Sequence, residues 1–181
     1  MKKMNKKYLI AAILATAVSS NAFAEEKKNE ISAFVYANKQ IDPAGQDPMV
    51  TVYASYGRFL TERIGITGSV NVTKAGGFTL GGVGVGGKYY FKVGQKGDFV
   101  PFVVAELQFG LGGDDTTDIY YTNLAAGGGA SLFITETASI DGRLVYQVGS
   151  QSVTTYTGFG SYDSTASTSA VLLTLGLTQR F

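Results

Sequence analysis

Three features of this sequence have residue types and spacings that could support chemistry. The segment 82–87 fits the pattern G-x-G-x-x-G, which lets a backbone approach a pyrophosphate when it joins a strand to a helix. The segment 114–118 contains three aspartates, and Ca²⁺ prefers carboxylate oxygens as ligands. The third feature is a set of charged residues within segments made mainly of small and apolar residues: Arg58, Lys88, Glu106, Asp141 and Arg143.

The first two features have simpler explanations. Residues 88–91, Lys-Tyr-Tyr-Phe, follow the glycines and have the composition of a strand, so no helix N-terminus is expected there for a phosphate. Gly82, Gly84 and Gly87 would instead relieve crowding and permit strong curvature in a narrow barrel. The aspartates lack the ligand spacing of an EF-hand, which favours a solvated acidic loop over a calcium site. We therefore expect neither a cofactor nor a metal.

The residue inventory argues against catalysis. The sequence contains no histidine, which is the commonest general base and the usual partner of a nucleophilic serine. It also contains no cysteine, which excludes disulfide bonds and cysteine-ligated metals. We expect no catalytic residues and a protein that is not an enzyme.

The N-terminal segment predicts export. Four lysines precede an apolar run at 8–18 that is too short to span a bilayer as a helix, and residues 22–24 read Ala-Phe-Ala. This pattern is typical of a cleaved signal peptide at 1–24, which leaves one domain at 25–181. Of the 15 basic residues, 11 then remain against 14 acidic ones, a formal charge of −3. A chain with that charge is not expected to bind nucleic acid.

The remainder of the chain predicts an all-β fold. No stretch after residue 24 has helical periodicity, whereas apolar and polar residues alternate with a period of two in one segment after another. In 64–73, for example, Ile64, Ile66, Val70 and Val72 share one face, and the other face is Gly, Thr, Ser and Asn. The alternation predicts eight strands, at 31–40, 49–60, 64–73, 78–92, 98–110, 119–134, 138–152 and 168–181.

Composition indicates where the apolar faces point. Charged residues make up 16% of the sequence, below the roughly 25% that is usual in globular proteins, and the polar faces carry few of them. A soluble barrel, which is the alternative, would need many charges on its water-facing positions. The pattern therefore favours an eight-stranded antiparallel up-and-down transmembrane β-barrel whose apolar face contacts membrane lipids.

The five charged residues should then point into the barrel. An eight-stranded barrel is just wide enough for side chains to fill it. We expect these residues to pair with one another and to close the interior, and a path for protons or ions is the alternative.

Connections of unequal length orient the barrel. Turns at 61–63, 93–97 and 135–137 are short, as on the periplasmic side of such barrels, and those at 41–48, 111–118 and 150–167 are longer, as on the outside. The last is rich in Ser, Thr, Tyr and Gly without alternation, and for it we expect a mobile loop. Six aspartates and three aromatic residues fall in the outer loops: Asp42, Asp47, Asp114, Asp115, Asp118, Asp163, Tyr156, Phe159 and Tyr162.

Two of the short turns share a sequence pattern. Residues 59–62 read Phe-Leu-Thr-Glu and residues 133–136 read Phe-Ile-Thr-Glu. We expect the same turn at both places, with the aromatic residue at the membrane interface.

Segments from several strands resemble the small outer-membrane β-barrel family, which includes opacity-type and attachment-type surface proteins. They are Gly86-Gly87-Lys88-Tyr89-Tyr90-Phe91, Phe99-Val100-Pro101-Phe102-Val103 and Phe133-Ile134-Thr135-Glu136. The resemblance covers essentially all of 25–181 and implies the bacterial outer membrane, with its lipids and lipopolysaccharide as neighbours. The C-terminal segment is similar to the signal that the barrel assembly machinery recognises during insertion, carried here by Leu173, Leu175, Leu177 and Phe181.

For function, the resemblance implies a structural or adhesion role in which surface-exposed loops bind a host or extracellular ligand. A narrow channel for small solutes or ions is the alternative. A lipid-modifying enzyme has less support, because known barrel enzymes of this size depend on histidine.

Overall fold

The structure is a computed structural model that describes residues 29–38, 49–75, 77–93 and 95–181. The expected signal peptide at 1–24 and the loop at 41–48, with Asp42 and Asp47, lie outside the described residues. Across the described ranges all regular elements are β-strands, and no helix in them is long and apolar enough to cross a bilayer.

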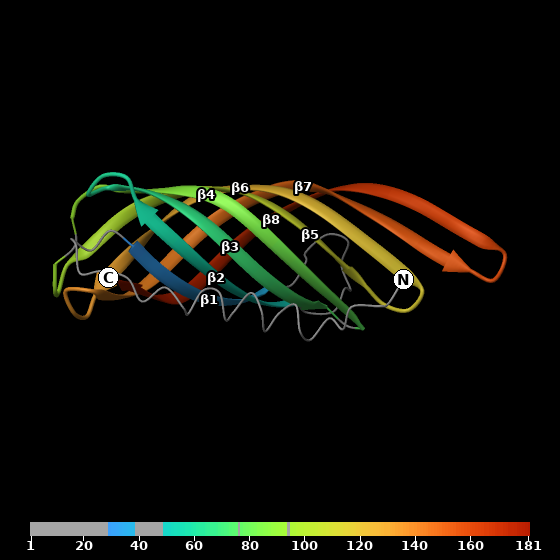
Figure 1. Ribbon diagram of the computed structural model, residues 1–181, viewed down its shortest axis with the longest axis horizontal. Helices are drawn as coiled ribbons and strands as arrows, with labels where there is room; N and C mark the ends of the chain where they lie inside the picture. The colour runs from blue at the N-terminus through green and yellow to red at the C-terminus, as the bar shows by residue number, and fades with distance from the viewer. Residues whose placement is uncertain (1–28, 39–48, 76, 94) are drawn as a thin grey trace.

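Eight strands form one antiparallel sheet that closes into a barrel, which confirms the predicted fold class (Figure 1). Each strand pairs with the next one along the chain, and the last pairs with the first. Closure leaves the barrel wall without a free edge, so its backbone hydrogen bonds are satisfied internally. The strands are β1 (Asn29–Asn38), β2 (Met49–Phe59), β3 (Ile64–Ala75), β4 (Phe78–Tyr90), β5 (Phe99–Gly113), β6 (Thr117–Phe133), β7 (Ala138–Thr157) and β8 (Gly160–Arg180).

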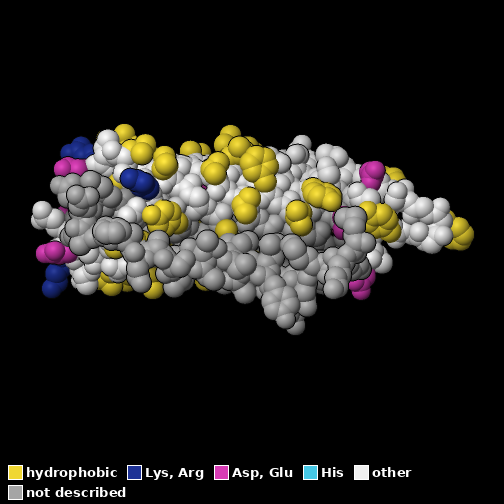
Figure 2. Space-filling model, viewed as in Figure 1, with side chains coloured by type: hydrophobic (Ala, Val, Ile, Leu, Met, Phe, Trp, Pro, Cys, Tyr) yellow, Lys and Arg dark blue, Asp and Glu magenta, His cyan; other side chains and the backbone are white. Residues whose placement is uncertain are grey.

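The apolar face of each strand lies on the outside of the barrel. Exposed side chains of the wall include Val52, Ile66, Val85, Leu107 and Leu173. Figure 2 shows hydrophobic side chains over the wall and charged ones toward the two ends. An apolar surface of this extent is unfavourable in water and favourable in lipid, so this is a barrel built to lie in a bilayer.

The inside of the barrel holds the opposite set of positions. An apolar cluster of Tyr90, Val100, Phe102 and Phe133 is buried there, and the remaining buried positions are largely polar or charged. We call the end of the barrel with the turns at 60–63, 91–98 and 134–137 the inner end, and the opposite end the outer end.

The two similar turns at the inner end have the same hydrogen bonds, as expected. In each, the amide after the phenylalanine donates to the carbonyl of the first residue of the next strand, at 2.8 and 2.9 Å. The hydroxyl of Thr61 or Thr135 accepts the amide hydrogen of that same residue, at 3.1 and 2.8 Å. The phenylalanines do not lie at the membrane interface, however, because Phe59 and Phe133 point into the barrel, where both rings face Arg180.

The outer end corrects two predictions. The expected loop at 111–118 is a short turn at 114–116, because β5 and β6 continue into it. The expected mobile loop at 150–167 is a hairpin, in which β7 and β8 stay paired from Ser150↔Ser167 to Thr157↔Gly160. Outside the bilayer both faces of a strand contact water, so apolar and polar residues need not alternate. Thr and Tyr are nevertheless residue types that favour strands. The hairpin projects beyond the other strands (Figure 1).

Candidate functional site: the barrel interior and the outer hairpin

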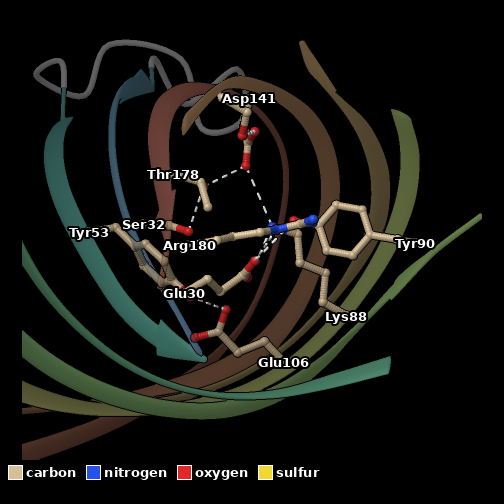
Figure 3. Close-up of polar contacts among 10 residues, drawn as sticks. Glu30, Ser32, Tyr53, Lys88, Tyr90, Glu106, Asp141, Thr178 and Arg180 are labelled. Atoms are coloured by element: carbon tan, nitrogen blue, oxygen red, sulfur yellow. Dashed lines mark hydrogen bonds and ion pairs between the residues drawn. The ribbon is translucent and has the colours of Figure 1, made fainter. Parts of the chain in front are cut away.

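Lys88 of β4 lies in an ion cluster inside the barrel (Figure 3). Its Nζ is 3.3 Å from Oε1 of Glu30 on β1 and 3.5 Å from Oδ2 of Asp141 on β7. All three side chains are buried, and Asp141 is fully buried. Buried charges are costly unless they are paired, so this cluster ties three strands together across the interior.

Arg180 of β8 brings a second cation to the cluster. Its Nε is 3.8 Å from Oε2 of Glu30. Its Cζ lies 5.0, 4.4 and 4.7 Å from the ring centroids of Phe59, Tyr90 and Phe133. Nε and Nη2 are buried and have no hydrogen-bond partner among the described residues, so the aromatic rings and the charge of Glu30 stabilise this guanidinium.

Hydroxyl groups complete the environment of the two carboxylates. Asp141 accepts hydrogen bonds from Ser139 Oγ and Thr178 Oγ1, both at 2.7 Å. Glu30 accepts one from the Tyr90 hydroxyl at 3.1 Å. The cluster of Lys88, Arg180, Glu30 and Asp141 therefore has two charges of each sign and additional hydrogen bonds, as a stable buried network requires.

Glu106 and Arg143 form a separate group. Glu106 accepts hydrogen bonds from the Tyr53 hydroxyl at 2.8 Å and from Ser69. Arg143 donates from Nε to Thr174 Oγ1 at 2.9 Å, and its Cζ lies 4.6 Å from the Tyr53 ring centroid. Tyr53 thus contacts both groups, and within the described part of the chain Glu106 makes no ion pair.

The five charged residues named from sequence are therefore not one cluster. Lys88 and Asp141 pair, whereas Glu106 and Arg143 point inward without an ion pair to each other. The prediction for Arg58 is wrong: it is exposed, and it shares the outward face of β2 with Val52 and Tyr56. It lies near the inner end of the strand, where an outward-facing charge can reach the lipid headgroups or water.

Sequence reasoning missed Glu30 and Arg180, which complete the cluster. Glu30 lies one residue before the predicted start of the first strand. Arg180 lies at an even-numbered position of β8, the same face as Thr174 and Thr178, so the alternation could have placed it inside.

Small cavities lie between these groups. One cavity of about 20 Å³ is lined by residues that include Tyr36, Gln108 and Arg143. A second, of about 10 Å³, lies between Lys88, Phe102 and their neighbours. Spaces of this size hold about one water molecule each.

The glycines of the G-x-G-x-x-G pattern lie in β4, in a strand rather than a strand–helix turn. A Cβ on Gly84 would collide with the Glu106 carboxylate and Ser69 Oγ, and one on Gly82 with the Tyr121 hydroxyl. These two glycines make room for interior side chains, as the sequence suggested. At Gly87 a Cβ would make only ordinary contacts.

The outer hairpin exposes its aromatic residues. Phe159 is fully exposed at the turn, and Tyr156 and Tyr162 are exposed on either side of it. The Tyr156 hydroxyl donates to Asp118 Oδ2 at 3.1 Å, and this hydrogen bond raises the pKa of Tyr156. The nearby charge of Asp163 acts in the same direction.

The acidic turn at 114–118 has a structural role. Asp114 accepts hydrogen bonds from the amide of Thr116 at 2.8 Å and from its hydroxyl at 3.0 Å. These bonds, the amide first, hold the pKa of Asp114 below its usual value. No group of three or more acidic side chains in the described ranges is arranged to hold a metal ion.

Comparisons with known proteins give structural neighbours only, because no protein-family model and no curated protein matches the chain. The N-terminal β-barrel domain of Pseudomonas aeruginosa OprF is 16% identical, with a TM-score of 0.58 over 85% of this chain and 98% of that one. Neisserial surface protein A is also 16% identical, with a TM-score of 0.59 over 84% and 95%. The outer membrane protein AlkL, solved in lipid bilayers, is 12% identical, with a TM-score of 0.58 over 90% and 94%.

At these identities the likeness establishes the fold. Together with the apolar outer wall, it supports an outer-membrane barrel. The chain has the fold of the small eight-stranded outer-membrane β-barrels.

Proposed function

We propose that this chain is a non-conducting protein of the bacterial outer membrane that holds a paired β-sheet outside the cell as a binding surface for a host or extracellular ligand. The role is binding rather than catalysis, as in the adhesion class of small surface barrels.

The observation that carries this proposal is the length of the outer hairpin. A tilted strand needs roughly 9 to 11 residues to cross a bilayer. β7 and β8 have 20 and 21 residues, about twice that number. At about 3.3 Å per residue, the excess extends some 30 Å along the strands. β6 pairs with β7 as far as Thr117↔Thr155, and β5 pairs with β6 as far as Gly113↔Asp118, so the projecting sheet contains the outer ends of β5 and β6 beside the β7–β8 hairpin.

The surface of this sheet suits recognition. Tyr120, Tyr156, Phe159 and Tyr162 are exposed on or beside it. Aromatic side chains provide large contact area at low conformational cost and are enriched among residues that dominate binding energy. A purely structural barrel gains nothing from presenting them to water.

The packed interior supports binding over the channel alternative. The four-residue ion cluster and the aromatic rings around Arg180 cross the lumen near its inner end. The cavities of about 20 and 10 Å³ have room for about one water molecule each, which is too little for a solute.

Assembly by the barrel insertion machinery belongs to the same proposal. Phe181 exchanges two backbone hydrogen bonds with Asn29, both at 3.0 Å, and its ring lies 6.5 Å from that of Tyr56 on the outer wall. It is in phase with the exposed residues Leu173, Leu175 and Leu177. These four residues form the lipid-facing surface of the C-terminal strand that a recognition partner would contact.

The test is a shortened hairpin. Gln151 and Ala166 are opposite each other in the β7–β8 register, so residues 152–165 can be replaced by an Asn-Gly turn without changing the barrel below. We expect bacteria or beads that carry the shortened protein to lose attachment to host cells and extracellular matrix. The folded state of the variant is checked by its heat-dependent mobility on gels.

A Phe159→Ser variant distinguishes the contribution of the hairpin tip to attachment from that of the sheet. Partial loss would assign part of the attachment to the tip. Attachment by the correctly folded, shortened protein at the level of the unaltered chain would disprove the proposal.

A further inference from the structure

The outer part of β8 has a partner on one side only. β1 pairs with β8 from Glu30↔Arg180 to Val35↔Leu175, whereas β7 pairs with β8 along its whole length. Beyond Leu175, toward the hairpin turn, no other described strand lies against β8. The barrel wall is closed, but within the described residues the sheet that leaves it has an edge.

The register shows which backbone groups line this edge. Asn29 and Phe181 exchange both backbone hydrogen bonds across the β1–β8 seam, whereas the amide of Arg180 donates to Thr137 on the β7 side. In an antiparallel ladder these directions alternate. Alternate residues counted back from Phe181 therefore direct their N–H and C=O groups away from β7, and in the outer part these are Ser161, Asp163, Thr165 and Ser167.

Asp163 is the only charged residue of 161–169, so the sequence offers this edge little protection from pairing. Natural edge strands are usually short or carry proline, lysine or a bulge. Residues 161–169 contain no proline and no lysine, and their register with β7 is continuous. Apart from Tyr162 their side chains are small or medium in size, and almost all are exposed. The strand is therefore open to a further strand.

Charge indicates which kind of strand fits. Asp118, Thr154 and Asp163 lie side by side in one row across β6, β7 and β8, with Tyr156 next to them. Residues 107–142 and 144–179, which include the whole projecting sheet, contain neither Lys nor Arg. An added strand would place a side chain directly opposite Asp163, where a cation would be favourable and an anion unfavourable.

We propose that the free outer edge of β8 binds an extended polypeptide segment with basic residues at alternate positions, which joins the sheet as an additional strand beside Ser161–Ser167. This inference rests on the proposed function and names the class of ligand. Main-chain hydrogen bonds supply affinity, and the carboxylate of Asp163, which would lie opposite the added strand, selects for Lys or Arg.

The test uses the full-length protein refolded in lipid nanodiscs and a peptide of alternating Lys and Val residues. Its counterpart with Glu in place of Lys is the charge control. We expect saturable binding of the Lys peptide that weakens as salt is added, and no binding of the Glu peptide. Equal binding of the two peptides overturns the assignment of a basic ligand.

A matched pair of variants tests edge pairing itself. Thr165→Pro removes an N–H that points away from β7, so the hairpin keeps its own hydrogen bonds, whereas Thr165→Val keeps that N–H and removes only the hydroxyl. We expect T165P to weaken binding of the Lys peptide about tenfold and T165V to leave it unchanged. Asp163→Asn should reduce both affinity and salt dependence.

The outcomes separate this inference from the proposed function. If folded T165P binds the peptide as tightly as T165V, edge pairing is wrong. If T165P still attaches to host cells while the shortened hairpin does not, the hairpin is the binding element but acts through its faces or tip. If the shortened hairpin also attaches, the proposed function itself fails.

Discussion

At the scale of single residues, buried charge is the feature with the largest consequences. Lys88 is the cation that lies within 4 Å of both Glu30 and Asp141. A single substitution there leaves two carboxylates in the interior with one fewer cation, and the desolvation cost of those carboxylates is no longer offset.

We therefore expect Lys88→Met to lower the free energy of unfolding by about 3–5 kcal/mol. Urea unfolding in lipid vesicles, followed by the gel mobility of the folded form, measures this. Lys74→Met is the matched control, because Lys74 is exposed near the outer end of β3 and its loss should change stability little. Equal stability of the two variants would show that the ion cluster contributes nothing.

Glu106 should respond differently, because its hydrogen-bond partners are hydroxyl groups and not cations. Glu106→Gln keeps an oxygen that can accept from Tyr53 or Ser69, so we expect a loss of no more than about 1 kcal/mol. Asp141→Asn removes a partner of Lys88 and should cost about 3 kcal/mol or more in the same unfolding assay. The reverse order of the two losses would mean that Glu106, and not Asp141, neutralises the buried cations.

At the scale of elements, the glycines of β4 leave room for the side chains that crowd the barrel interior next to this strand. Gly84 faces the interior, where a methyl group would displace the Glu106 carboxylate and Ser69. Gly68 is on the adjacent strand and faces outward, with no atom within 4 Å of an added Cβ.

Gly84→Ala should therefore lower the free energy of unfolding by about 1–3 kcal/mol through overpacking. Gly68→Ala should have no such cost. The measurement is the fraction of each variant that refolds into detergent micelles, followed by urea unfolding. A loss of the same size at both positions would point to a general intolerance of Ala in these strands rather than to crowding.

Strand prediction succeeded where lipid imposes a pattern and failed where it does not. The starts at Met49, Ile64, Phe78 and Ala138 match the prediction because one face meets lipid and the other the interior, which forces alternation. The outer halves of β7 and β8 have water on both faces, so residues 150–167 carry no alternation and resemble a loop. Hydropathy could not reveal their pairing.

The interior site was predictable in part for the same reason. Lys88 and Asp141 lie on faces that alternate clearly, and both point inward. Arg58 does not lie on the interior face on which it is predicted, because its position matches the outward residues Val50 and Val52. Which inward charges meet depends on the register between strands far apart in sequence, and a single sequence does not contain that information.

At the scale of the whole molecule, the chain has two parts: a barrel wall that contacts lipid and a sheet that projects from it. The barrel is apolar outside and filled with polar and aromatic side chains inside, so its lipid contacts and its closed interior both follow from one period-two pattern. The projecting sheet neither contacts lipid nor encloses a packed interior. Substitutions on its surface should change binding without changing the barrel, which is the arrangement that a surface-binding protein needs.

The closed interior leads to a prediction for the purified protein in planar bilayers. The rings of Phe59, Tyr90 and Phe133 surround Arg180, and Lys88 pairs beside them, so an ion would have to cross a region of buried charges and aromatic rings. We expect no discrete conductance steps at moderate voltage. Insertion is verified by recovering the protein and confirming its heat-dependent gel mobility, and heat-unfolded protein is the blank. Reproducible steps that scale with salt concentration and are absent from the blank would contradict this and favour the channel alternative, because only a continuous water-filled path gives steps of constant size.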